Sequence, residues 1–298
     1  MNAPRQGTLI ERACHRAATG VVAAALCLAA LAPVVRAGDG ETMSERTLKR
    51  IVERQKELFA EAQRQGEKLD VEAFQTQVQS VTHDYEMLLR ASPEFAAAYA
   101  AYGYLLSKVG MPREAAAMLL RANQLDPDIA LVKNQLGNLL AEDGKPLQAA
   151  PYFLAAIKLE PGEPLYHYQL GMILAEARDE FLKSGEWSRA TIDETMLHSF
   201  RQAAELAPDR FEFVYRYAEA FYDLEKPDWD AALKVWSTLE EKAGSAIERQ
   251  TMRLHAANIL IKTGRPDHAR LLLGTVDDPA LQGQKQKLLG QLAEQAQK

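Results

Sequence analysis

The chain has 298 residues, of which 47% are hydrophobic, and its formal net charge is −6 at pH 7. It is long enough to bury a sizeable core, and no run of alternating apolar residues indicates a β-strand. The excess of carboxylates argues against nucleic acid or an anionic membrane as the main partner.

Residues 1–37 are predicted to be an export signal that is cleaved before Gly38. Arginines give the segment a basic start, an apolar run of 15 residues follows at Val21–Val35, and Val35-Arg36-Ala37 supplies a small-residue cleavage site. A spanning helix needs about 20 apolar residues, and Pro33 interrupts this run, so cleavage is favoured over a retained membrane anchor. Cleavage would remove both cysteines and change the net charge to −9. We therefore expect a periplasmic or secreted protein without disulfides and without membrane insertion after removal of the signal.

Residues 38–95 are predicted to form N-terminal helices that include a degenerate half-repeat. Ser44–Gly66 has the pattern of a charged helix with Ser44 as its cap and one apolar face. A short coiled coil is disfavoured because Gln55 interrupts the apolar seam, so the helix is interpreted as a cap on a solenoid of helices. Val71–Ala91 is the predicted second helix.

One pattern is written twice without a gap, over residues 96–129 and 130–163. Gly103 recurs as Gly137 and Pro127 recurs as Pro161, each 34 residues later. The same spacing joins Leu106 with Leu140, Gly110 with Gly144, Ala115 with Ala149, Leu119 with Phe153 and Ala122 with Ala156. A fixed period of this length is typical of stacked helical repeats.

The repeated residues have physical roles. Gly103 lies inside an apolar stripe, where the absence of a side chain lets a neighbouring helix approach. Gly110-Met111-Pro112 ends one helix and begins the next, because glycine suits the left-handed position after a helix and proline suits the first helical position. The stretch resembles the tetratricopeptide repeat (TPR), a helix–turn–helix unit of 34 residues. The resemblance implies an all-α, right-handed α-solenoid.

Three weaker units come next, at residues 164–210, 211–249 and 250–276, and residues 277–298 are predicted to be a C-terminal capping helix. The first of these units carries an insertion around residues 177–196, which includes Trp187. The insertion is either part of a longer helix pair with a solvated loop or an added element near the binding face.

The sequence offers little for catalysis. It has no phosphate-cradling glycine loop, no HExxH motif and no nucleophile elbow. His255 and His268, with Asp267, are the histidines that could converge on a metal, and an ordinary surface or packing role is favoured for them. We therefore predict no catalytic residues, no metal site, no cofactor and no enzymatic activity.

The resemblance implies that ligands lie in a concave groove lined by the first helix of each unit. The residues expected in this groove are Tyr104, Asn134, Asn138, Tyr168, Met172, Tyr215, Glu219, Tyr222, Asp223 and Asn258, and Leu254 and Ile261 are expected on the same face. Tyrosine offers apolar area with a polar tip, and asparagine can bond a peptide backbone as donor and acceptor. Ala100 and Tyr104 stand where the family's carboxylate clamp has lysine and asparagine, so that activity is not expected. The alternative is that the tyrosines pack against a neighbouring helix or a folded-back terminus.

These patterns favour a non-enzymatic protein–protein interaction or scaffold module in the cell envelope that binds a peptide or protein segment. The carboxylates of the fourth unit, Glu219 and Asp223 among them, predict a basic end on that segment. A structural subunit that assembles with copies of itself, through its N-terminal helix or the ends of the solenoid, is the alternative. An enzyme is the least favoured hypothesis.

Overall fold

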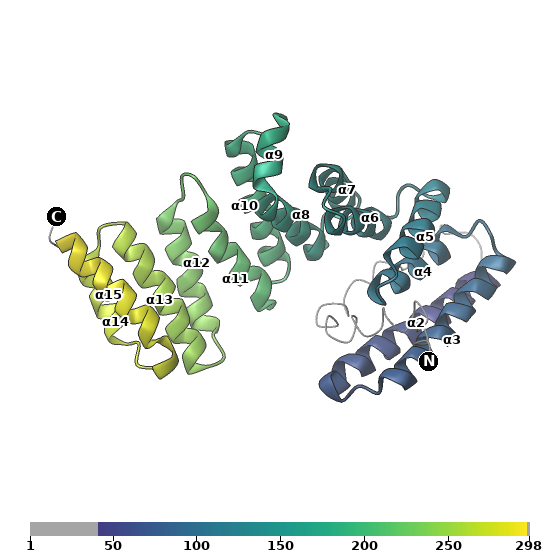
Figure 1. The fold of residues 1–298 in the computed structure, drawn as a ribbon, viewed down its shortest axis with the longest axis horizontal. Coiled ribbons are helices and arrows are strands. Elements are labelled where there is room, and N and C mark those ends of the chain that lie inside the picture. Colours follow the sequence, from purple (N-terminus) through teal and green to yellow (C-terminus); the bar gives the residue numbers. More distant parts are fainter. Residues whose placement is uncertain (1–40, 297–298) are drawn as a thin grey trace, which may run out of the picture. The chain divides into compact units, whose positions relative to one another are not determined.

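The structure is a computed structural model that describes residues 41–296, so the predicted export signal lies outside the described residues. Every regular element in the described part is an α-helix or a short 3-10 helix (Figure 1). Within these residues, no helix combines the length and the apolar character that crossing a membrane requires. The chain divides into two compact units, one that runs to Pro161 and one that starts at Gly162. Each unit is described by itself.

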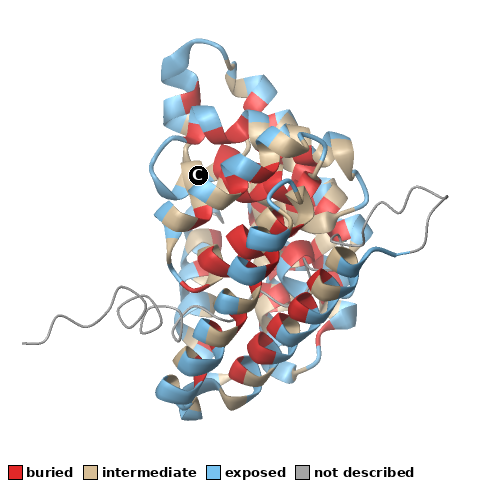
Figure 2. Ribbon diagram, turned by 90° about the vertical axis from the view of Figure 1, so that its right-hand side faces the viewer, coloured by how far each residue is buried: buried red, intermediate tan, exposed pale blue. Residues whose placement is uncertain are grey.

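The described residues of the first unit, from 41 onward, form three helix pairs. Their bounds are α2 Met43–Gln65, α3 Val71–Ala91, α4 Ala96–Lys108, α5 Pro112–Leu125, α6 Ala130–Glu142 and α7 Pro146–Leu159, with the short helix η3 Gly66–Lys68 between α2 and α3. Helix α2 packs on α3, α4 on α5, and α6 on α7. Residues coloured as buried lie along the helix sides that face other helices (Figure 2).

Helix α2 begins one residue before the predicted cap. Thr42, not Ser44, is the N-cap: its hydroxyl accepts a hydrogen bond from the Glu45 backbone, and the Glu45 carboxylate accepts one from the Thr42 backbone. This capping box satisfies two backbone donors at once, which a cap at Ser44 would not do. Gln55, the residue that interrupts the apolar seam, is fully buried and accepts a hydrogen bond of 2.7 Å from the Tyr85 hydroxyl of α3.

The repeated glycines occupy two kinds of position. Gly110 has φ of 76° and Gly144 has φ of 70°, so both adopt the left-handed conformation that ends a helix. Gly137 lies in α6 where it faces the Phe153 ring of α7, and a Cβ there would come within 2.8 Å of that ring. The close contact between the paired helices therefore depends on the missing side chain.

The second unit continues the pairs and ends in a single helix. Its helices are α8 Pro164–Glu176, α9 Arg178–Ser184, α10 Arg189–Leu206, α11 Phe211–Ala220, α12 Trp229–Lys242, α13 Ala246–Lys262, α14 Pro266–Gly274 and α15 Gln282–Ala296, with the short helices η4 Phe221–Asp223 and η5 Pro279–Leu281. Helix α8 packs on α10, α11 on α12, and α13 on α14.

The insertion of the third repeat is an ordered element and not a solvated loop. It forms α9 and the first turns of α10. Phe181 of α9 is fully buried, and the Trp187 ring packs edge-on against it with 5.3 Å between centroids. Phe181 and Trp187 give the inserted segment a small core of its own, which the solvated-loop interpretation of the insertion did not include.

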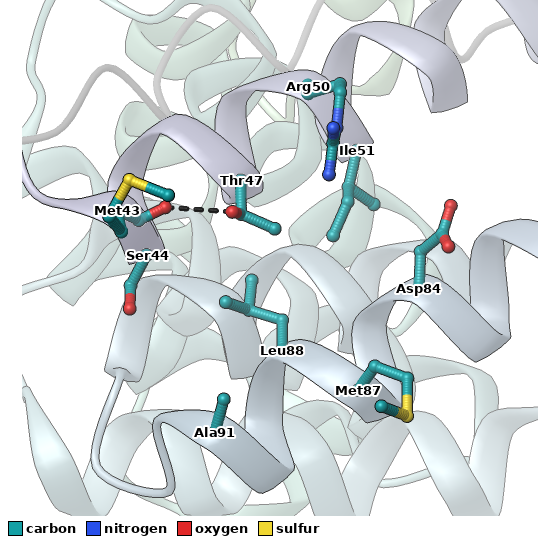
Figure 3. Close-up of a pocket in the computed structure, with 9 residues that line it drawn as sticks. All are labelled: Met43, Ser44, Thr47, Arg50, Ile51, Asp84, Met87, Leu88 and Ala91. Atoms are coloured by element: carbon teal, nitrogen blue, oxygen red, sulfur yellow. Dashed lines mark hydrogen bonds between the residues drawn. The ribbon is translucent and has the colours of Figure 1, made fainter.

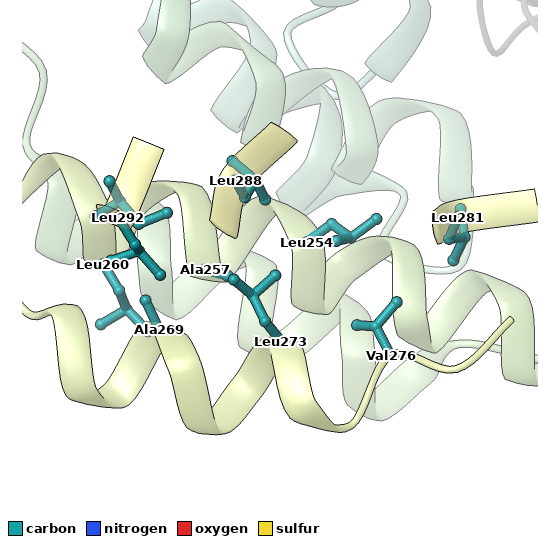
Figure 4. Packing of buried hydrophobic residues seen from close by; sticks show 10 residues of the cluster. Leu254, Ala257, Leu260, Ala269, Leu273, Val276, Leu281, Leu288 and Leu292 are labelled. Carbon is teal, nitrogen blue, oxygen red and sulfur yellow. The ribbon is translucent and has the colours of Figure 1, made fainter. Parts of the chain in front are cut away.

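Helix α15 covers part of the preceding pair. Its Leu288 and Leu292 form one buried cluster with Leu254 and Ile261 of α13 and with Leu273 of α14 (Figure 4). The apolar stripe of α13 that would otherwise face solvent is thus covered by the last helix of the chain.

Candidate functional site

Four aromatic or imidazole rings gather where α11, η4, α12 and α13 meet. The His255 ring of α13 stacks on the Trp236 ring of α12, with 3.9 Å between ring centroids and an angle of 1° between planes. The Tyr215 hydroxyl lies 3.3 Å from Nε2 of His255, and the Tyr222 hydroxyl lies 3.5 Å from its Nδ1. The Tyr222 hydroxyl also donates to the His255 carbonyl oxygen at 3.3 Å. We call Tyr215, Glu219, Tyr222, Trp236 and His255 the aromatic site.

Burial controls the charge of this site. It lowers the pKa of His255 to about 4, so the imidazole is neutral near pH 7. It raises the pKa of Tyr222 to about 12 and also raises that of Tyr215, so both phenols keep their protons. The two tyrosines are half-buried while Trp236 is fully buried. The accessible part of the site therefore includes the surfaces of two fixed tyrosines, which pack on the uncharged rings of His255 and Trp236.

Glu219 supplies the carboxylate of the aromatic site. It lies one helical turn after Tyr215 on α11 and is hydrogen-bonded to that tyrosine. Burial raises the pKa of Glu219, while the nearby Arg216 lowers it. Asn258 of α13 is hydrogen-bonded to Tyr222, so this predicted residue also lies beside the site.

The insertion of the third repeat is joined to the turn that carries Tyr222. Asp193 of α10 accepts hydrogen bonds from Arg189 Nε at 2.8 Å and from the Glu225 backbone at 2.8 Å. Arg189 donates a second bond to the Asp223 carbonyl oxygen. Because Asp193 is buried and takes part in both contacts, it fixes the polypeptide that comes after Tyr222.

Two other predicted residues lie on α8, beside a different set of rings. Tyr168 packs on Phe213 with 4.7 Å between centroids and on Phe200 with 5.8 Å. Burial raises the pKa of Tyr168 to about 12. Met172 is half-buried on the same helix. The three predicted tyrosines of the second unit therefore belong to two neighbouring clusters of rings and not to one.

In the first unit, the predicted surface is only partly present. Tyr104 and Asn134 are 0% exposed, which corrects the expectation that they offer accessible side chains. Asn138 is half-buried. For Tyr104 the reason is compositional: helix α4 is alanine, tyrosine and leucine on nearly every side, so burial extends around most of its circumference.

The sequence did not indicate that His255 stacks on Trp236 and contacts Tyr215 and Tyr222. It indicated Trp236 only as a residue at an equivalent position of the repeats. It assigned Leu254 and Ile261 to the open face, and both are buried in the α15 contact. The groove residues are expected one position before or after the buried ones. His255 lies next to the buried pair Ala256-Ala257, so this one-position rule would have indicated it. His268 is exposed, and no group of three or more potential metal ligands occurs in residues 41–296.

Cavities are also found at other places in the described residues. A cavity of about 290 Å³ opens between α2 and α3, and Met43, Arg50 and Met87 are among the residues around it (Figure 3). Another, of about 440 Å³, is lined by α10 and by Tyr217. Because Tyr217 comes two positions after Tyr215, it projects from a different face of α11.

No protein-family model matches the sequence, and no curated protein matches it either. The solved structures that resemble the fold include TPR proteins. YrrB, a TPR protein described as having an unusual peptide-binding site, has a TM-score of 0.53 and 18% identity over 64% of this chain and 90% of its own. PilF of Pseudomonas aeruginosa has a TM-score of 0.54 and 16% identity over 86% of this chain and 100% of its own. PilW, described as a type IV pilus biogenesis factor, has a TM-score of 0.51 and 13% identity over 84% and 100%.

These likenesses and the stacked helix pairs show that the chain has an all-α, TPR-like solenoid fold. At such identities they define the fold alone, so the function has to be argued from the residues.

Proposed function

We propose that the chain is a non-enzymatic interaction module that binds a segment of another protein across the first helices of its second unit. The observation that carries the proposal is the aromatic site, in which two half-exposed tyrosines are held by a stacked histidine–tryptophan pair. Rings that are already fixed lose little freedom on binding, so a partner segment meets a preorganised surface.

The chemistry of the surface suits a peptide or protein segment. Tyrosine combines apolar area with a hydrogen-bonding tip and is enriched among the residues that dominate interface energies. Met172, Asn258 and Asp223 extend the same mixture of apolar and polar groups, and each is half-buried. Met172 and Asn258 lie on α8 and α13, each the first helix of its pair. TPR proteins bind ligands on the first helices of their repeats.

The test is to capture partners with the full chain from the producing organism and to measure how two matched variants bind the captured protein. Tyr215→Ala removes a ring of the aromatic site, and Tyr217→Ala removes an equally half-buried ring from another face of the same helix. We expect Tyr215→Ala to weaken binding by about 2 kcal/mol, a factor of about 30, and Tyr217→Ala to leave it within about twofold. Circular dichroism of both variants controls for unfolding.

The proposal fails if both variants bind as the parent does, or if Tyr217→Ala weakens binding as much as Tyr215→Ala while both remain folded. In that case the partner uses another surface.

A second candidate function is self-assembly through the α2–α3 pair. The observation that favours it is the exposure of two methionines beside the cavity of Figure 3, Met43 at 73% and Met87 at 49%. Methionine is common at adaptable apolar contacts. Light scattering decides between the candidates: assembly through this pair requires a mass above that of one chain, which Met87→Glu should reduce to that of one chain.

We also propose that the protein acts in the cell envelope or outside the cell, on the basis of the N-terminal sequence. The basic start, the apolar run Val21–Val35 and the Val35-Arg36-Ala37 site support it. N-terminal sequencing of the protein from its producing organism should find Gly38 first. An intact Val21–Val35 segment would instead indicate an anchor or a protein that is not exported.

A further inference from the structure

Of the three carboxylates on α11 and η4, two make an ion pair with an arginine of the described chain and one does not. The Glu212 carboxylate lies 3.5 Å from Nη2 of Arg210. The Asp223 carboxylate lies 2.9 Å from Nη2 of Arg216. Glu219 makes no ion pair with any residue in the described range 41–296. One negative charge on this face is therefore left without a direct counter-charge.

Arg216, which lowers the pKa of Glu219, makes no ion pair with it, and both Arg216 and Lys262 already make other contacts. Arg216, besides its bond to Asp223, lies over the Phe200 ring at 4.6 Å from the centroid. Lys262 of α13 lies over the Trp229 ring at 5.5 Å. Movement of either side chain toward Glu219 would break a contact that it already makes, so the protein itself does not readily neutralise this carboxylate.

Glu219 is placed between the two tyrosines of the aromatic site. Tyr215 precedes it by four residues and Tyr222 comes three residues after it, which puts the three side chains on one face. The carboxylate is half-buried, and the Tyr215 hydroxyl is its hydrogen-bonding neighbour. A half-buried carboxylate between aromatic rings has free acceptor capacity for a cation, because an ionised carboxylate accepts about four hydrogen bonds.

We propose that the aromatic site takes a lysine or arginine side chain of the partner, with its charged end against Glu219 and its aliphatic stem over Tyr215 and Tyr222. This inference rests on the proposed function and names the chemistry of the partner. A cation at Glu219 gains charge-assisted hydrogen bonds, its stem covers apolar ring surface, and the tyrosine faces attract positive charge. An acidic side chain in the same place would meet like charge.

The test uses small probes with the full chain, so it does not depend on knowing the partner. N-acetyl-arginine amide is titrated while the imidazole signals of His255 are followed by NMR, and its neutral isostere N-acetyl-citrulline amide is the matched probe. We expect saturable shifts with the arginine probe and at least fivefold weaker binding of the citrulline probe. Glu219→Gln should weaken arginine binding at least fivefold and leave citrulline binding unchanged. Glu241→Gln, which neutralises an exposed carboxylate of α12, should change neither.

Three results would each overturn the inference: equal binding of the two probes, unchanged arginine binding by Glu219→Gln, or no saturable shift with the arginine probe. None of these would by itself remove the proposed function. If Tyr215→Ala still loses the captured partner, the surface binds a partner without a preference for cations. If Tyr215→Ala keeps the partner, the interaction surface itself is wrong.

Discussion

The substitution of Gly171 by alanine tests how the helix pairs are packed. A Cβ at this position of α8 would lie 2.7 Å from Cε1 and 2.8 Å from Cδ1 of the Phe200 ring in α10. The ring is fully buried and is held between Tyr168 and Arg216, so it cannot swing aside at little cost. Overpacking of this kind costs about 1–3 kcal/mol, against a gain of about 1 kcal/mol in helix propensity. We expect Gly171→Ala to lower the free energy of unfolding by about 1 kcal/mol.

A second glycine of the same unit provides the matched control. Gly290 lies in the interior of α15, and a Cβ there would have nothing within 4 Å. Gly290→Ala should therefore raise the free energy of unfolding by about 0.5–1 kcal/mol. The same glycine-to-alanine change should thus lower the free energy of unfolding at Gly171 and raise it at Gly290.

Tryptophan fluorescence during urea unfolding measures both variants. Trp187, Trp229 and Trp236 are the three tryptophans of the chain, and all lie in the second unit, so the signal reports that unit. With a slope of about 2 kcal/mol per molar urea, the midpoint should fall by about 0.5 M for Gly171→Ala and rise by about 0.3 M for Gly290→Ala. A Gly171→Ala protein as stable as the parent, or more stable, would refute the packing argument.

Three further outcomes are expected. Gly137→Leu should lower the free energy of unfolding of the first unit by about 3 kcal/mol, because the new side chain enters the space of the Phe153 ring. Circular dichroism measures the unfolding midpoint, and an unchanged midpoint would mean that the repeat is wrongly phased. Asp193→Ala should lower the free energy of unfolding by about 2–3 kcal/mol in the fluorescence assay, because the Arg189 side chain and the Glu225 backbone N–H would lose their acceptor. A loss below about 0.5 kcal/mol would contradict this role of Asp193. The neighbours of His255 are the hydroxyls of Tyr215 and Tyr222, and Glu219 is hydrogen-bonded to Tyr215. Because burial lowers the pKa of His255 in the folded protein, its imidazole is protonated in the unfolded state first as the pH falls. The contribution of His255 to stability should therefore be fully present above about pH 6.5 and fall by about 2 kcal/mol toward pH 4. His255→Phe should remove this part of the pH dependence, and His268→Gln should keep it.

The sequence predicts the fold well where local signals are strong. The glycine–proline punctuation at Gly110 and Pro112 and the small residue opposite a large one, as at Gly137 and Phe153, both have direct structural counterparts. These features act within one helix pair, so a repeat period is sufficient to find them. The cap of α2 was misplaced by two residues because Thr42 and Ser44 are both good caps, and only the position of Glu45 decides between them.

The candidate site was less predictable, because exposure depends on what packs against each helix. The one-position rule treats every first helix as having an open face. Tyr104 is covered although its position fits the rule. Leu254 is covered by α15, whose Leu288 lies 34 residues further along the chain. The partnership of His255 with Trp236 also joins two helices whose contact no periodicity reports. Such tertiary contacts outweigh local pattern.

The central claim is that a partner contacts the face of the second unit that carries the aromatic site. Photo-crosslinking in the producing organism tests it most directly, with benzoylphenylalanine placed at one position per variant. Met172 and Asn258 lie on the proposed face, and Leu271 of α14, which is 74% exposed, lies on a second helix and serves as the control. The account predicts that probes at Met172 and Asn258 capture the same protein and that a probe at Leu271 does not. Capture of that protein from Leu271, with none from Met172 or Asn258, would contradict the account.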